Sequence, residues 1–390
     1  MIRVVLFAIT LFFLEALHAT DTLIDKEASP LKINFLGYTT DNFNPTLDNT
    51  YHASLIKLSA HGKLVTINNA LSLQANYAAN YQGAKLDSNT LTKSNDFYST
   101  EFGLLARLYL QKELFLDALV SYEKTDELPG TGISKLRKNI LFSDEKTQVN
   151  ALLGITYGSD IASRSMSLTY SQIDSEYADI NSYSSLFSFT QKTLTSNIKF
   201  KLSSATHFIL FIEHQQDDYD ALSRDDSTMQ RIMVGMDWQA SGSSTIKALI
   251  GKYQRNPNIA DKTSGLTWQL SYQYSPRDDF KIQLSSTQSS IAGESELSTN
   301  SVQQQWLVQA DYLYNSQWHY GLNAVTGQTN YKESQGKRTF DEALIKLFTS
   351  YQFRKYSRVE FYLGDRSVKE SNNIIDYQQN EVGLSWYYKL

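Results

Sequence analysis

The side chains that most often carry catalysis show no catalytic arrangement in this chain. After His18, the histidines are His52, His61, His207, His214 and His319, and none has the His-Glu-x-x-His spacing that brings two imidazoles onto one zinc ion. There is no Gly-x-Ser-x-Gly turn to expose a serine nucleophile. The chain has no cysteine, which excludes disulfides and thiolate metal sites. We therefore expect no enzyme activity, no metal centre and no cofactor.

Two acidic pairs, Asp217-Asp218 and Asp225-Asp226, fall in one polar segment that we predict to be an outer loop. We interpret this segment as a solvated loop, and the alternative interpretation is that its carboxylates hold a divalent cation that bridges lipopolysaccharide. The formal net charge is only -5 and the basic residues are scattered, so no nucleic-acid footprint is indicated.

The chain is predicted to consist of β-strands, because apolar and polar residues alternate almost everywhere after residue 30. One example is Leu266, Trp268, Leu270, Tyr272 and Tyr274, which alternate with Thr267, Gln269, Ser271 and Gln273. Another is Ile232, Val234, Met236 and Trp238, where Met233 is the one apolar residue of the opposite series. Period-2 alternation with one apolar face predicts amphipathic strands, as in barrels that meet lipid.

The two ends of the chain point to the outer membrane. Arg3 precedes the apolar run 4–14 and then Ala19, which predicts a secretory signal peptide over residues 1–19. The last nine residues alternate up to the carboxylate, with Trp386, Tyr388 and Leu390 on the apolar face. This ending resembles the closing strand that the outer-membrane assembly machinery reads, and the resemblance assigns that signal to these three residues.

Short and long connections alternate between the predicted strands. Tight turns include Gln111-Lys112 and Ser203 to Thr206, and long loops include Thr125 to Glu145 and Tyr331 to Arg338. Short periplasmic turns and long extracellular loops are typical of outer-membrane barrels. We count about eighteen strands of roughly 9 to 11 residues, and sixteen also fit. The predicted fold is an all-β, transmembrane, antiparallel up-and-down barrel over residues 31–390, preceded by a periplasmic segment over 20–30.

A closed sheet of this size leaves an aqueous lumen, so the chain is expected to be a pore. Charged residues in the register opposite the apolar series are the candidates to line it, although a solvated wall network is the simpler role for each. They are Arg107, Asp117, Lys199, Lys201, Glu213, Arg231, Asp237, Lys281, Asp311, Lys346, Arg358 and Glu360.

The predicted loop Thr125 to Glu145 is the longest, and it carries both apolar residues and the basic cluster Lys135, Arg137 and Lys138. Loops of this length usually have a function or are disordered. One interpretation is a constriction or gate that folds into the pore, and the other is an external cap over the rim.

Recurrent glycines and tryptophans mark paired hairpins in the centre of the chain. They are Gly235, Trp238, Gly251, Gly265, Trp268 and Pro276-Arg277, and near the N-terminus Tyr38 precedes Asp41-Asn42. The pattern is similar to that of a family of outer-membrane β-barrel porins of exopolysaccharide and capsule gene clusters, over nearly the whole mature chain.

The resemblance implies an outer-membrane pore that exports an extracellular polysaccharide, a biofilm or capsule polymer, by Wzx/Wzy-type secretion. Its implied partners are outer-membrane lipid and lipopolysaccharide, the assembly machinery, a periplasmic polysaccharide export protein and the polysaccharide itself. A general or sugar-specific diffusion porin shares every feature read from the residues. A structural or adhesive barrel is the third alternative.

Overall fold

The computed structural model describes residues 29–389 except 45, 47–51, 68–69, 87–95, 159–162, 182, 292–297, 334–335 and 372–374. The predicted signal peptide, nearly all of the predicted periplasmic segment 20–30, and Leu390 lie outside the described residues. Among the described residues, no helix is both long enough and apolar enough to cross a membrane.

The described chain is built from eighteen strands and two short 3-10 helices. The first nine strands are β1 Ser29–Thr40, β2 Ala53–Ile67, β3 Leu71–Leu86, β4 Asp96–Gln111, β5 Leu114–Glu127, β6 Asp144–Tyr157, β7 Arg164–Tyr177, β8 Phe189–Ser203 and β9 Thr206–Tyr219. The others are β10 Ser227–Ser241, β11 Ser244–Pro257, β12 Thr263–Arg277, β13 Phe280–Ile291, β14 Ser298–Leu313, β15 Trp318–Glu333, β16 Gly336–Arg354, β17 Ser357–Glu370 and β18 Asp376–Lys389. The 3-10 helices are η1 Gly132–Leu136 and η2 Ser184–Phe187.

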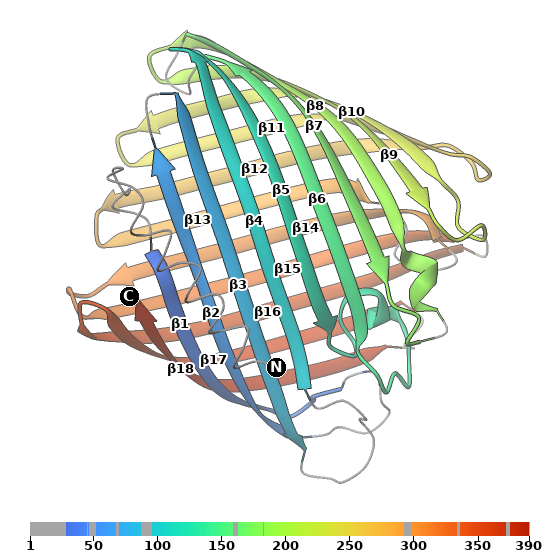
Figure 1. Cartoon of the computed structure of the whole chain (residues 1–390), viewed down its shortest axis with the longest axis vertical. Coiled ribbons are helices and arrows are strands. Elements are labelled where there is room, and N and C mark those ends of the chain that lie inside the picture. Colours follow the sequence, from blue (N-terminus) through green and yellow to red (C-terminus); the bar gives the residue numbers. More distant parts are fainter. Residues whose placement is uncertain are drawn as a thin grey trace.

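The strands close into one antiparallel barrel. Each strand pairs with the next along the chain, and β1 pairs with β18, where Phe35 lies opposite Trp386. The tilted strands can be followed around the barrel in Figure 1. The predicted eighteen-stranded up-and-down barrel is therefore confirmed.

The two ends of the barrel differ. One end, which we call the turn end, holds short connections such as Gln111 to Leu114 and Ser203 to Thr206, together with the beginning of β1 and the end of β18. The other, the loop end, holds the long connections, including 128–143 between β5 and β6. One predicted long loop is wrong: Tyr331 pairs with Arg338, so β15 and β16 form a ladder that ends at Glu333 and Gly336.

The strands are 12 to 19 residues long, longer than the predicted 9 to 11. Towards the loop end, their outward residues become polar, as at Gln172 and Asp174 on β7 and Gln216 and Asp218 on β9. These side chains pair with each other outside the sheet, with Gln216 Nε2 2.8 Å from Asp218 Oδ1. The predicted strand length was too small because the hydrogen-bonded ladder continues beyond the apolar band.

The outer face carries the apolar series, as the alternation predicts. Val120, Leu153 and Ile232 point outward and are 57%, 65% and 55% exposed. Aromatic rings gather on this face near the turn end, where Trp318 stacks on Tyr320 and Trp386 lies against Tyr388. An apolar band edged by aromatic rings is the surface that a barrel presents to lipid.

The backbones of β10 and β11 approach each other closely at two glycines. A Cβ atom on Gly235 would collide with the carbonyl oxygen of Ala248, and one on Gly251 with that of Ile232. Glycine in a strand interior often marks such a close approach of backbones. Beside this close approach, inward-pointing Met233 packs on Ile209 and Leu249 in a small buried cluster of the inner wall.

We expect the Gly235→Val barrel to fail to assemble, because the new side chain would have to displace the β11 backbone. Folded barrels migrate differently before and after boiling in detergent gels, so the loss of that mobility difference is the measurement. Gly37→Val is the matched control, since a Cβ at Gly37 meets nothing within 4 Å. A normally assembled Gly235→Val protein would show that this close approach of backbones tolerates a side chain.

Candidate functional site

The inner wall of the barrel is polar and accessible. The twelve charged residues predicted to line the pore all lie in the register opposite the outward apolar series. Arg107 and Lys346 keep 40% and 36% of their side-chain surface exposed although both point inward. The interior is therefore open to water at these positions, and their effect on passing solutes stays a prediction.

The structure brings most of these residues into ion pairs. Arg107 Nε lies 2.6 Å from Asp117 Oδ1, and Arg231 Nη2 lies 2.9 Å from Glu213 Oε2. Glu360 lies between Lys346 and Arg358, at 3.8 and 3.7 Å. Asp311 pairs with His319 at 3.0 Å and lies opposite Lys281 in the register.

The three remaining candidates, Lys199, Lys201 and Asp237, lie towards the turn end, where Lys201 and Asp237 are both opposite His207. The wall thus alternates in charge sign along much of its circumference. This arrangement gives a hydrated surface without a single dominant charge.

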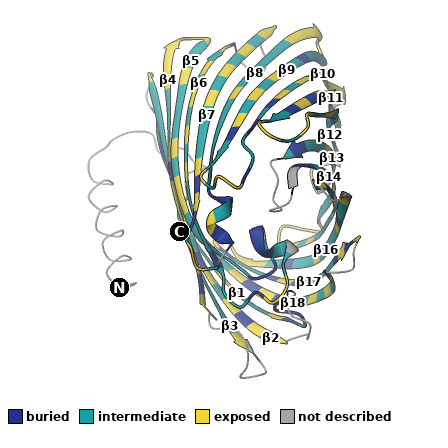
Figure 2. Ribbon diagram, turned by 90° about the vertical axis from the view of Figure 1, so that its right-hand side faces the viewer, coloured by how far each residue is buried: buried dark blue, intermediate teal, exposed yellow. Residues whose placement is uncertain are grey.

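The connection 128–143, which we call the mouth loop, folds into the barrel at the loop end. Figure 2 shows η1 and η2 inside the ring of strands. Ile133 and Ile140 of the mouth loop form a buried cluster with Tyr177, Tyr183 and Phe187. The loop therefore has a small hydrophobic core of its own, which fixes its position within the mouth.

Polar contacts tie the mouth loop to two other connections. Asn44 Nδ2 donates to the carbonyl oxygen of Ile140 at 2.8 Å, and Arg137 stacks 3.7 Å over the ring of Tyr183. Buried Asp144 accepts hydrogen bonds from Tyr183 and Ser184, at 3.1 and 2.6 Å. Burial and the Asp144 carboxylate raise the pKa of Tyr183, so its hydroxyl stays protonated and donates to that carboxylate.

The mouth loop also reaches towards the far wall. Lys135 Nζ lies 5.9 Å from the ring centroid of Phe340 on β16, although β5 and β16 are not neighbours in the barrel. Lys138 is exposed. Of the two interpretations from sequence, the geometry matches the loop that folds inward. A gating role for Lys135, Arg137 and Lys138 stays a prediction.

A second inward element comes from β13 and β14. Strand β13 pairs with β12 only as far as Gln288, which lies opposite Trp268. Beyond Gln288, β13 continues to Ile291 and pairs with β14. Ser290 shares its register with outward Leu284 but bonds to Arg255, which points inward. The end of this hairpin, Ser289 to Ile291 and Ser298 to Ser301, must therefore lean across the inner face, and we call it the hairpin tip.

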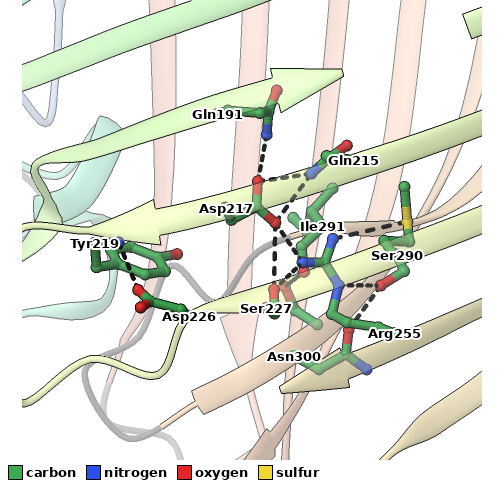
Figure 3. Close-up of polar contacts among 12 residues, drawn as sticks. Gln191, Gln215, Asp217, Tyr219, Asp226, Ser227, Arg255, Ser290, Ile291 and Asn300 are labelled. Atoms are coloured by element: carbon green, nitrogen blue, oxygen red, sulfur yellow. Dashed lines mark hydrogen bonds and ion pairs between the residues drawn. The ribbon is translucent and has the colours of Figure 1, made fainter. Parts of the chain in front are cut away.

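Arg255 anchors the hairpin tip to the wall (Figure 3). Its Nη1 lies 2.6 Å from Asp217 Oδ2, and both side chains are 0% exposed. Its Nε donates to Ser290 Oγ at 3.0 Å, and that hydroxyl donates to Asn300 Oδ1 at 2.7 Å. Asp217 also accepts from Gln191 and Gln215 at 2.8 Å each, so the buried carboxylate is well satisfied.

This geometry argues against the alternative interpretation of the acidic pairs as a cation site. Asp217 points inward to Arg255, whereas Asp218 points outward to Lys192, so the two carboxylates cannot share one ion. Asp225 accepts backbone hydrogen bonds from Ile259 and Ala260, and Asp226 accepts one from Tyr219. In the part of the chain that the structure describes, no three His, Cys, Asp or Glu side chains form a group that could hold a metal.

The buried Arg255–Asp217 pair was missed because strand alternation was not applied beyond the apolar band, and Asp217 was predicted to lie in a loop. Asp217 lies four residues beyond Glu213, and Arg255 lies two beyond Tyr253, so each shares an inward register. Extending the alternation past the apolar band would have placed both side chains inside the barrel. Ser290, the hydrogen-bond partner of Arg255, lies in an outward register, so alternation does not indicate that it contacts an inward side chain.

Comparison with known proteins supports the fold. No protein-family profile and no curated protein matches the sequence. A BenF-like porin from Pseudomonas fluorescens Pf-5 superposes with a TM-score of 0.50 at 13% identity, covering 94% of this chain and 99% of that one. The copper transporter OprC has a TM-score of 0.50 at 9% identity, covering 93% of this chain and 81% of that one. OpdK of Pseudomonas aeruginosa, solved with vanillate, gives 0.48 at 13% identity, covering 94% and 100%.

The chain is an integral outer-membrane β-barrel. Closed barrels are the only sheets that satisfy every backbone hydrogen bond in lipid, and this one has an apolar outer face and a hydrated inner face. Its fold is that of outer-membrane porins. The affiliation with exopolysaccharide gene clusters finds no support in these comparisons.

Proposed function

We propose that the protein is a diffusion porin for small hydrophilic solutes. The observation that carries the proposal is the polar, water-accessible inner wall of a closed eighteen-stranded barrel whose mouth is narrowed by loops packed inside it. Barrels of this strand number leave an aqueous channel. With the short turns in the periplasm, the mouth loop and hairpin tip lie at the external opening.

Polysaccharide export remains the alternative implied by the sequence resemblance. A polymer needs a wide passage at both openings, whereas Ile133 and Ile140 hold the mouth loop in a packed position inside the barrel. Export would require this core to open. Small solutes need no such change, so the diffusion porin accounts for the geometry with fewer steps.

The remaining partners are proposals as well. Trp386 points outward at 45% exposure near the turn end, as a closing strand read by the assembly machinery would present it. Lipopolysaccharide would meet the outward polar ends of the strands, such as Asp174 and Lys192. A periplasmic export protein belongs only with the export alternative.

A gene deletion separates the two functions. We expect slower uptake of small sugars and unchanged high-mass polysaccharide in the medium and periplasm of the same culture. Complementation with the intact gene should restore uptake. Unchanged uptake together with loss of external polymer would reject the diffusion porin in favour of export.

A further inference from the structure

A cavity of about 450 Å³ lies in the lumen between the hairpin tip and strands β7 to β10. Its lining is dominated by hydroxyl and amide side chains. They include Ser171, Gln191, Thr193, Thr195, Gln215 and Ser289. Cavities of roughly 300 to 1,000 Å³ hold small organic ligands, so this one suits a solute of the size of a sugar unit or two.

The only charges in the lining cancel each other. Glu213 and Arg231 form an ion pair at 2.9 Å with 11% and 13% of their side chains exposed. A carboxylate solute would have to break this pair to gain a cation. Met229 and Ile291 are the only apolar side chains in the lining, so the cavity offers no aromatic face to a ring.

Several hydroxyls of the lining remain available to a ligand. Among the described residues, those of Thr193 and Thr195 on β8 and Ser171 on β7 make no hydrogen bond to another protein group. Gln191 and Gln215 each direct their Nε2 to Asp217, which fixes the orientation of both amides.

The cavity is also held rigidly. Its floor is the paired wall of β7 to β10, and its other side is the hairpin tip, which the fully buried Arg255 and Asp217 anchor through Ser290. Polar groups fixed on packed strands recognise a ligand without first becoming ordered, and this lowers the entropic cost of binding.

We propose that this cavity is a binding site for a neutral polyhydroxylated solute, a monosaccharide or disaccharide, on its way through the barrel. The proposal rests on the diffusion function and names its solute class. Uncharged hydroxyls that both donate and accept suit sugar hydroxyls, while the internally neutral Glu213–Arg231 pair gives no net charge to attract an ion.

The test is a single-channel recording in planar bilayers with sucrose as the probe. Sucrose is expected to reduce the potassium chloride current in a saturable manner, and benzoate at equal concentration is not. The double variant Thr193→Val, Thr195→Val removes two hydroxyls at nearly constant shape. It should raise the half-blocking sucrose concentration roughly tenfold, as the loss of two modest hydrogen bonds implies.

The matched control is Thr156→Val, Thr245→Val, which removes two inward hydroxyls near the turn end, outside the cavity. It should leave the sucrose response unchanged. A conducting channel that shows no sucrose block, or equal responses in the two double variants, would overturn the site while leaving the porin function intact. A barrel that conducts no potassium chloride would instead overturn the porin function.

Discussion

Replacing Arg255 with methionine is expected to lower the free energy of unfolding of the barrel by about 3 to 5 kcal/mol, because it leaves the Asp217 charge buried without its partner. Both side chains are 0% exposed, so water cannot compensate. The hairpin tip also loses its anchor at Ser290. Urea titration of the folded fraction in lipid vesicles measures the change in the free energy of unfolding. Increased noise in the single-channel current reports the loss of the hairpin tip's anchor.

Arg107→Met is the matched control for this experiment. Arg107 is paired with Asp117 at 2.6 Å but is 40% exposed, so the expected loss is below about 1 kcal/mol. The double variant Arg255→Met, Asp217→Asn removes both charges and should recover much of the stability lost in the single variant. Equal losses for Arg255→Met and Arg107→Met would contradict the importance of burial at the Arg255–Asp217 pair.

Replacing the mouth loop by a two-residue Asn-Gly turn is expected to raise single-channel conductance severalfold. Glu127 and Asp144 are already opposite each other in the β5–β6 ladder, so a tight hairpin can join them. The deletion removes η1 together with Ile133 and Ile140, the mouth loop's part of the buried cluster. A conductance recording in planar bilayers gives the result directly.

A less invasive variant covers the case in which the shortened barrel does not assemble. Ile133→Asp should expel the mouth loop from its core with Tyr183 and Phe187, and raise conductance in the same direction. Shortening the β11–β12 connection at Ile259, which is 85% exposed, should leave conductance unchanged. If neither mouth-loop variant alters conductance, the loop does not narrow the conducting path.

Alternation was sufficient to predict the barrel and the direction of its side chains. A one-residue step moves a side chain to the opposite face, so Arg231 must point inward if Ile232 meets lipid. Together with the alternation of short and long connections, it predicted about eighteen strands, with sixteen also fitting, and the structure has eighteen. Met233 was the apparent exception within the Arg231 to Gln239 stretch, and its packing on Ile209 and Leu249 explains it.

Alternation failed where the chain leaves the wall. Nothing local in the mouth loop indicates that Lys135 approaches Phe340, because that contact depends on the barrel closing first. The contact between Arg255 and Ser290 has the same origin, since an outward register can reach an inward one only when the hairpin leans across the lumen. Strand length was underestimated because the hydrogen-bonded ladder extends beyond the lipid-facing band, where the outward residues are polar.

Swelling of liposomes that contain the purified barrel tests the central claim most directly. Vesicles are diluted into isosmotic glucose, sucrose, raffinose or dextran, and the rate of solute influx is followed by light scattering. The porin account predicts rapid swelling with glucose, progressively slower swelling with sucrose and raffinose, and none with dextran. No swelling with glucose, or dextran influx as fast as glucose influx, would contradict it.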